Sequence, residues 1–282
     1  MHNPDDKNFS IVTVLFTLSL CAVSCGLLSA TTPAEEGSYQ ERRAAIVTIF
    51  GNQTPRKWGE FVPGVKKSLQ TDQKVIALTL DACGGGQWGS GFDKKLIDYL
   101  IAHQIPATLF INARWIDKNP ELFQQLAANP LFEIENHGAL HKPLSVTGAT
   151  AYGATGTLNA GEVFDEIEQN ALKIEQLTGK KPRFFRSGTA YYDEVAVQIA
   201  NALGYEIVNF SVLGDAGATY SKEQVKNALL TATSGSIVIA HMNQPIAHGT
   251  VRGETADGII AALPELQKRG FLFVTLSAFP LK

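Results

Sequence analysis

Two histidines spaced four residues apart form a potential metal-binding pair. Residues 136–143 read Asn-His-Gly-Ala-Leu-His-Lys-Pro and follow a short apolar run. On a helical turn, the spacing of His137 and His141 places both rings on one face. Two neutral imidazoles so placed can bind one divalent metal. The pair alone is weak evidence, because histidines at this spacing are more often ordinary surface or core residues.

An aspartate at the end of an apolar run is the second candidate. Residues 75–86 read Val-Ile-Ala-Leu-Thr-Leu-Asp-Ala-Cys-Gly-Gly-Gly, which predicts a buried strand ending near Asp81 and then a glycine loop. A carboxylate there needs a partner. Parallel α/β barrels hold their catalytic groups at this end of the strand. The alternative is that Asp81 only caps the next helix.

Two more polar residues end apolar runs. Arg186 closes the run in residues 182–186, and His241 closes the run in residues 236–241. Either one alone is compatible with a buried structural role. Because Asp81 and the histidine pair follow apolar runs in the same way, the repeated placement predicts one shared functional site.

The order of these motifs resembles the polysaccharide deacetylases with a NodB-homology domain, carbohydrate esterase family 4. That family has Thr-Phe-Asp-Asp, His-x3-His-Pro, Arg-x-Pro, Asp/Trp and Leu-x-His motifs. The corresponding segments here are residues 79–82, 137–143, 186–188, 215–216 and 239–241. The connecting segments 105–110 and 178–186 are also similar, and the resemblance extends over about residues 74–279. It implies an α/β fold, a distorted (β/α) barrel with about seven parallel strands.

The resemblance implies a role for each retained residue. His137, His141 and Asp81 are predicted to bind a divalent metal, zinc first, with cobalt or nickel as alternatives. A metal there would polarise the carbonyl of an N-acetyl group and activate water. Asp81 is also the predicted general base, and Arg186 would keep it ionised. His241 would protonate the departing nitrogen.

The sequence departs from the family in the metal site and in the groove. Ala82 replaces the second Asp of the first motif, which binds the metal in the family. The usual neighbours of Arg186, its proline included, are also replaced. Ala216 replaces the tryptophan that lines the substrate groove. The metal site and the substrate therefore do not follow from the resemblance alone.

Two histidines are an incomplete zinc site, because catalytic zinc usually has three protein ligands. The missing ligand has several candidates in the sequence: Asp81, Cys83, Asp93, Asp215, Asn243 and His248. A site that binds metal weakly, or binds none, is the remaining alternative.

Substrate contacts are predicted for Trp88, Tyr191 and Asp215. Trp88 lies in the glycine loop after Asp81, where it would stack on a sugar or pack the loop down. The small, polar segment 145–160 is predicted to be a flexible loop or a wall over the site.

Composition excludes one class of partner and limits disulfide bonding. The 282-residue chain has a net charge of −3, so a nucleic-acid partner is not expected. It has three cysteines, of which Cys21 and Cys25 lie in the N-terminal segment. Removal of that segment would leave only Cys83, and no disulfide within the chain.

The N-terminal segment predicts export. Residues 11–28 are apolar and precede Ser-Ala-Thr-Thr-Pro, as in a signal peptide or an uncleaved membrane anchor. The predicted organisation is a signal or anchor over 1–30, an extension packed on the barrel over 31–73, and a catalytic domain over 74–282. The protein is expected to be periplasmic, envelope-bound or secreted, with membrane attachment through residues 1–30 as an alternative.

Apolar runs and helical patterns alternate along the catalytic domain, as in parallel βα units. The predicted strands are 75–80, 107–112, 132–135, 183–186, 206–211, 236–240 and 271–275. The predicted helices are 92–103, 119–128, 161–178, 191–203, 221–232 and 256–269.

These observations predict an exported, metal-dependent hydrolase of carbon–nitrogen bonds other than peptide bonds. Its expected reaction removes N-acetyl groups from an amino-sugar polysaccharide such as peptidoglycan or a related envelope glycan. One alternative is a degenerate glycan-binding module that has lost catalysis with the second Asp. The other is an amidase of small, non-sugar amides on the same fold.

Overall fold

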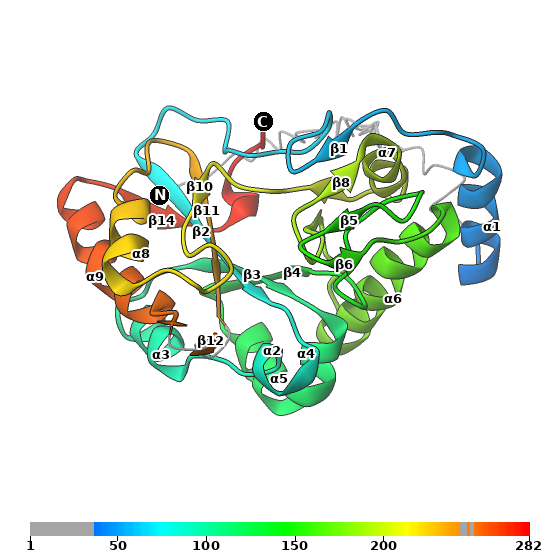
Figure 1. The fold of residues 1–282 in the computed structure, drawn as a ribbon. Coiled ribbons are helices and arrows are strands. Elements are labelled where there is room, and N and C mark those ends of the chain that lie inside the picture. The colour runs from blue at the N-terminus through cyan, green and yellow to red at the C-terminus, as the bar shows by residue number, and fades with distance from the viewer. Residues whose placement is uncertain (1–36, 243–246, 249–250) are drawn as a thin grey trace, which may run out of the picture. The chain divides into compact units, whose positions relative to one another are not determined.

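The structure, a computed structural model, describes residues 37–242, 247–248 and 251–282, so the segment predicted to direct export lies outside it. Residues 31–282 form one compact unit. Its centre is a parallel sheet with the strand order β10-β11-β2-β3-β4-β7-β9, and β14 pairs with β2 (Figure 1). The predicted fold, a distorted (β/α) barrel with about seven parallel strands, is confirmed.

The sheet strands are long in the middle and short towards the edges. They are β2 (Val75–Ala82), β3 (Ala107–Ile111), β4 (Phe132–Asn136), β7 (Phe184–Phe185), β9 (Glu206–Ile207), β10 (Val212–Leu213), β11 (Ser236–His241) and β14 (Leu272–Val274). Three antiparallel pairs lie outside the sheet: β1 (Trp58–Gly59) with β8 (Tyr192–Asp193), β5 (Thr150–Ala151) with β6 (Ala154–Thr155), and β12 (Ala247–His248) with β13 (Val251–Arg252).

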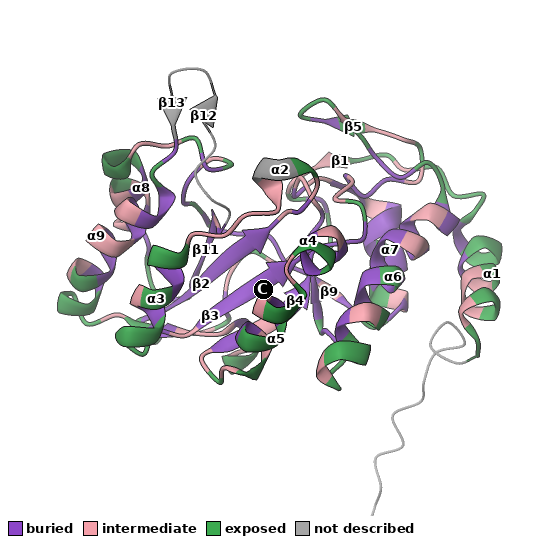
Figure 2. Ribbon diagram, turned by 90° about the horizontal axis from the view of Figure 1, so that it is seen from below, coloured by how far each residue is buried: buried purple, intermediate pink, exposed green. Residues whose placement is uncertain are grey.

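Helices connect the strands and cover the sheet. They are α1 (Tyr39–Phe50), α2 (Gly86–Gly89), α3 (Lys94–Ala102), α4 (Ala113–Lys118), α5 (Pro120–Ala128), α6 (Ala160–Thr178), α7 (Glu194–Ala202), α8 (Lys222–Leu229) and α9 (Thr255–Lys268), with a 3-10 turn at Leu276–Ala278. Figure 2 shows the central strands buried and the exposed residues on the outer sides of the helices.

Strand β2 pairs with β11, β3 and β14, and all eight of its residues are buried. Leu78, Leu80 and Ala82 belong to the apolar cluster that also holds residues of α3 and α9. Successive side chains of a strand point to opposite faces. Asp81 therefore lies on the inner face of the sheet, while Ala82 packs against the helices.

All seven predicted strands and all six predicted helices are present, with ends that differ by a few residues. The predicted strand 206–211 is too long, because β9 ends at Ile207. Helices α1, α2 and α4, strand β10 and the short strands of the antiparallel pairs were not predicted. Each missed element in the sheet or site region is short, and two to six residues carry too little periodicity to be detected.

Residues 37–73 of the predicted extension pack on the rest of the unit. Helix α1 lies along α6, where Tyr39 and Arg43 both donate hydrogen bonds to Asp165. Leu69 is fully buried and pairs with Leu281 in an antiparallel bridge. Among the described residues, no helix combines the length and the apolar character that a membrane span requires.

Candidate active site

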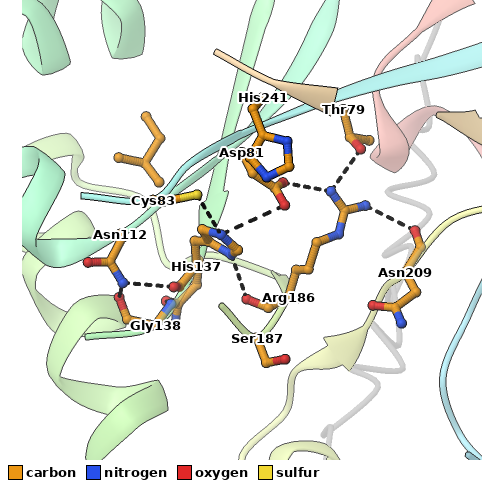
Figure 3. A network of polar contacts seen from close by, with 12 residues as sticks. Thr79, Asp81, Cys83, Asn112, His137, Gly138, Arg186, Ser187, Asn209 and His241 are labelled. Atoms are coloured by element: carbon orange, nitrogen blue, oxygen red, sulfur yellow. Dashed lines mark hydrogen bonds and ion pairs between the residues drawn. The ribbon is translucent and has the colours of Figure 1, made fainter. Parts of the chain in front are cut away.

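The carboxyl ends of neighbouring strands bring the predicted catalytic residues together. His241 of β11 is in register with Asp81 of β2. On the other side of β2 and β3, Asn136 of β4 is in register with Phe185 of β7, and His137 and Arg186 directly follow these two residues. Figure 3 shows these side chains converging on one point. Parallel pairing produces this cluster, because all the carboxyl ends meet at one edge.

Arg186 is fully buried and holds the Asp81 carboxylate. Its Nη1 donates to Asp81 Oδ1 at 2.7 Å and to the Thr79 hydroxyl at 2.8 Å. Its Nε and Nη2 donate to the carbonyls of Val208 and Asn209, both at 3.0 Å. Hydrogen bonds from Nε, Nη1 and Nη2 therefore hold the guanidinium beside the Asp81 carboxylate, which is itself buried. The predicted contact between Arg186 and Asp81 is present.

His137 is oriented by the backbone of the neighbouring strand. Its Nδ1 lies 2.9 Å from the Arg186 carbonyl, which can only accept, so Nδ1 carries the proton. In the neutral ring, Nε2 then has a free lone pair. This atom lies 3.7 Å from Asp81 Oδ2 and 3.9 Å from Cys83 Sγ. Such an orientation is typical of a metal-binding histidine.

His141 reaches the site through a loop and not through the predicted helical turn. Residues 137–143 contain no helix, and Gly138 and His141 have positive φ angles of 78° and 63°. The ring centroids of His137 and His141 are nevertheless 4.9 Å apart. A left-handed conformation is rare for histidine. The expected convergence is present, although the expected local geometry is wrong.

Buried side chains around this loop maintain its shape. Asn112 Nδ2 donates to the carbonyls of His137 and Gly138, and Glu166 accepts from the amides of Leu140 and Lys142. Burial raises the pKa of Glu166 to about 7, although these amides oppose the shift. Sequence reasoning missed both residues. Asn112 carried a usable signal, since it follows an apolar run as Asp81 does.

Gly188 leaves the space that His141 occupies. A Cβ atom at residue 188 would lie 2.3 Å from the His141 carbonyl oxygen and 2.4 Å from its ring. These distances are far below any van der Waals contact. The replacement of the usual residues after Arg186 therefore matches the unusual conformation of His141.

His241 is paired with Asp215, the aspartate for which a substrate contact is predicted. Asp215 is fully buried, and its carboxylate accepts from His241 Nδ1 at 2.9 Å, the His241 amide and the Thr255 hydroxyl. Asp215 has no exposed surface, and it fixes the orientation of the His241 ring through Nδ1.

A cysteine joins the two histidines. Cys83 Sγ and one ring nitrogen each of His137 and His141 all lie within 4.8 Å of one another. Cys83 follows Ala82 at the end of β2 and is partly exposed. A thiolate and two imidazoles are ligands that zinc and cobalt accept. The donor set therefore fits a divalent metal of this type.

The pKa values of His241 and Cys83 are shifted in opposite directions. Burial would lower the pKa of His241, but the Asp215 carboxylate and Cys83 raise it well above the ordinary value. Burial would raise the pKa of Cys83, yet the neighbouring His141 and His241 lower it well below the ordinary value. A protonated His241 and an ionised Cys83 are thus mutually stabilised.

A pocket of about 530 Å³ opens onto these groups. Its lining includes Asp81, Cys83, His141 and His241. The lining also contains Tyr152, which lies at the turn between β5 and β6, within the segment predicted as a loop or a wall. The pocket therefore brings Asp81, His241 and two of the three donors, Cys83 and His141, to one volume.

The remaining predicted residues lie around this pocket or outside the description. Tyr191 stacks between Trp58 and Tyr152, with ring centroids 5.7 and 5.4 Å away, so this aromatic group includes one pocket residue. Asp93 caps α3 through the amides of Lys95 and Leu96. Asn243 and the side chains of Trp88 and His248 lie outside the described residues.

Comparison with known proteins identifies the family. A sequence profile described as polysaccharide deacetylase matches residues 68–208. The peptidoglycan-N-acetylglucosamine deacetylase of Bacillus cereus (strain ATCC 14579) is 27% identical over 216 residues, which are 74% of this chain and 89% of that protein. An uncharacterized protein, YlxY, of Bacillus subtilis (strain 168) is 21% identical over 73% of this chain. The match spans only 57% of the length of YlxY.

Solved structures share the fold. A CE4 family pseudoenzyme from Bacillus anthracis superposes with a TM-score of 0.62 at 18% identity, covering 78% of this chain and 69% of that one. An acetyl xylan esterase from Clostridium thermocellum, in complex with a cobalt ion, has a TM-score of 0.57 at 21% identity, covering 73% and 89%. With the profile covering half of its length, this chain belongs to the polysaccharide deacetylase family, which includes hydrolases of carbon–nitrogen bonds other than peptide bonds.

Proposed function

We propose that the protein is an exported, metal-dependent deacetylase that removes N-acetyl groups from an amino-sugar polymer, with peptidoglycan or a related envelope glycan as its substrate. The observation that carries the proposal is the Asp81–Arg186 pair, which faces the same pocket as the His241–Asp215 pair. An ionised acid and a histidine with a raised pKa are the two groups that amide hydrolysis requires. The Bacillus cereus relative is named for this reaction on peptidoglycan.

Asp81 is suited to accept a proton from water. Arg186 donates to one of its oxygens, Oδ1, and stabilises the ionised form. The second oxygen is not used by Arg186 and is directed towards His137, on the pocket side. Asp81 would take the proton of the water that attacks the acetyl carbonyl, while the carbon–oxygen bond forms.

His241 is suited to complete the reaction. Asp215 holds its Nδ1, so the opposite nitrogen is available at the pocket. In the protonated state it would donate to the sugar nitrogen as the carbon–nitrogen bond breaks. The products are acetate and a free amine on the polymer. A divalent metal held by His137 and His141 would act as a Lewis acid towards the acetyl carbonyl.

Export to the cell envelope is part of the proposal. It rests on the apolar segment 11–28 and the small residues after it, which are typical of a signal peptide or an anchor. An envelope glycan is the substrate that an exported enzyme of this family would meet.

The test is acetate release by the full-length protein from acetylated chito-oligomers and from peptidoglycan, with zinc, with cobalt or with a chelator. Asp81→Asn keeps the size of the side chain but removes the base, so kcat/KM should fall by about 10²–10⁴-fold. The matched control is Asp117→Asn, because Asp117 is exposed and pairs with Lys173 on the outer surface. Equal rates for Asp81→Asn and the parent would refute the assignment.

A binding module is the second candidate, because Ala82 replaces a metal-binding Asp and one structural neighbour is a pseudoenzyme. A folded parent that binds chito-oligomers but releases no acetate under any metal condition would favour it. Chelator-sensitive release would exclude it.

A further inference from the structure

The missing metal ligand has a replacement one residue further along the chain. We propose that Cys83, His137 and His141 form the metal site, with the Cys83 thiolate in place of the absent carboxylate. The inference rests on the proposed function for the purpose of the site. The geometry of the three donors, however, stands independently of any substrate.

Strand geometry explains why residue 83 and not residue 82 supplies the ligand. The side chain of Ala82 is fully buried in the apolar cluster with Leu80, Ile111 and Trp115, on the helix-covered face of the sheet. The next residue points to the opposite face. Cys83 accordingly lines the pocket, and Figure 3 shows its sulfur directed at His137.

Each histidine presents one ring nitrogen to the group of three donors. Nδ1 of His137 is occupied by the Arg186 carbonyl, which leaves the lone pair of Nε2 directed at Cys83 Sγ, 3.9 Å away. Nε2 of His141 is buried and makes no hydrogen bond to any part of the chain that the structure describes. A buried nitrogen without a partner is unfavourable. A metal ion would satisfy it.

The distances are close to those of a tetrahedral site. Zinc–sulfur and zinc–nitrogen bonds place neighbouring ligand atoms roughly 3.4–3.6 Å apart. The three donors lie within 4.8 Å of one another, so binding a metal ion would draw them closer together. Three protein ligands leave the fourth position for water or substrate, as in catalytic zinc sites.

Three other candidates hold structural contacts. Asp81 has one oxygen, Oδ1, bound by Arg186 at 2.7 Å, and it lies outside the three-donor group. Asp215 is used entirely by His241 and Thr255, and Asp93 caps α3. Assigning Cys83 to the metal therefore leaves Asp81 as the base. A thiolate ligand also predicts preference for zinc, cobalt or cadmium over magnesium or manganese.

The experiment is a cobalt titration of the full-length protein carrying Cys21→Ser and Cys25→Ser, so that Cys83 is the only thiol. Cobalt bound to a thiolate gives a charge-transfer absorption band in the near ultraviolet. We expect this band to saturate at one equivalent. Adding Cys83→Ser should abolish it and weaken cobalt affinity by more than about 100-fold, which exceeds the usual loss when a residue that only hydrogen-bonds to a ligand is removed.

The control is His103→Ala in the same background, because His103 is exposed and lies outside the site. It should retain the band and the affinity. A second readout needs no substitution at residue 83: zinc should slow alkylation of the Cys83 thiol by iodoacetamide, and a chelator should restore the rate.

One equivalent of cobalt without the band, or equal affinity in Cys83→Ser, would overturn the inference. No cobalt binding by the folded protein, or alkylation that zinc does not slow, would also overturn it. Because these readouts use no substrate, the absence of acetate release would refute the deacetylase proposal and leave the coordination result standing.

Discussion

At the scale of single residues, the buried pairs determine what the pocket can do. Asp215 has no exposed surface, yet it governs His241 through two hydrogen bonds and its charge. Arg186 has the same relation to Asp81. The two residues that face the pocket, Asp81 and His241, are therefore each held by a buried partner, Arg186 and Asp215.

Replacing Asp215 with Asn should move the alkaline limb of the pH–rate profile to lower pH. The Asp215 charge raises the pKa of His241, so the imidazole keeps its proton across neutral pH and loses it only as the pH rises through that value. Without the charge, the limb should shift to lower pH. The measurement is kcat/KM for acetate release as a function of pH.

The control for this shift is Thr255→Val, which removes one hydrogen bond to Asp215 but keeps the charge. Its alkaline limb should stay close to that of the parent. An unchanged limb in Asp215→Asn would mean that His241 is not the acid.

At the scale of elements, the loop after β4 is matched to the turn after β7. His141 adopts a left-handed backbone conformation, and Gly188 of the neighbouring turn provides the space for it. Glu166, from α6, holds the amides of Leu140 and Lys142 on the other side. The loop after β4, the turn after β7 and helix α6 together position the His141 ring. If both histidines lay on one helical turn, the helix alone would set their spacing.

Gly188→Ala should therefore displace His141. The added methyl group overlaps the His141 carbonyl and ring, so the unfolding free energy should fall by about 1–3 kcal/mol. The rate should fall by roughly 100-fold, since a small misplacement of a site group has that effect. Urea unfolding and kcat for acetate release measure the two quantities.

Gly179→Ala is the matched control, because Gly179 caps α6 in the left-handed region and lies outside the pocket. It should lower the unfolding free energy by roughly 1–2 kcal/mol and leave kcat unchanged. Normal kcat in Gly188→Ala would contradict the positioning role.

At the scale of the whole molecule, residues 37–73 are integral to the compact unit. Arg42 of α1 pairs at 2.6 Å with Glu168 of α6, which is almost fully buried. Tyr205, next to β9, donates to the same carboxylate. One buried charge thus connects three parts of the chain that are distant in sequence.

Arg42→Met should destabilise the protein by about 3–5 kcal/mol, because it leaves the Glu168 carboxylate buried without its cation. Lys173→Met is the control. It breaks an exposed pair with Asp117 and should change the free energy by less than about 1 kcal/mol. Urea unfolding of both variants makes the comparison. A loss below about 1 kcal/mol for Arg42→Met would show that α1 is only loosely attached.

The sequence by itself determined the family, the alternation of strands and helices, and the residues that converge on the site. Apolar runs ending in Asp81, Arg186 and His241 suffice for this, because a parallel sheet gathers its strand ends at one edge.

Only the tertiary structure places Cys83 beside the two histidines, pairs Asp215 with His241 and sets the conformation of His141. Whether residue 82 or residue 83 faces the pocket depends on where the pleat of β2 ends. Burial of Asp215 and the space at Gly188 are produced by segments distant in the chain. Local sequence patterns do not reveal such contacts, because the contacts form only when separate elements pack together.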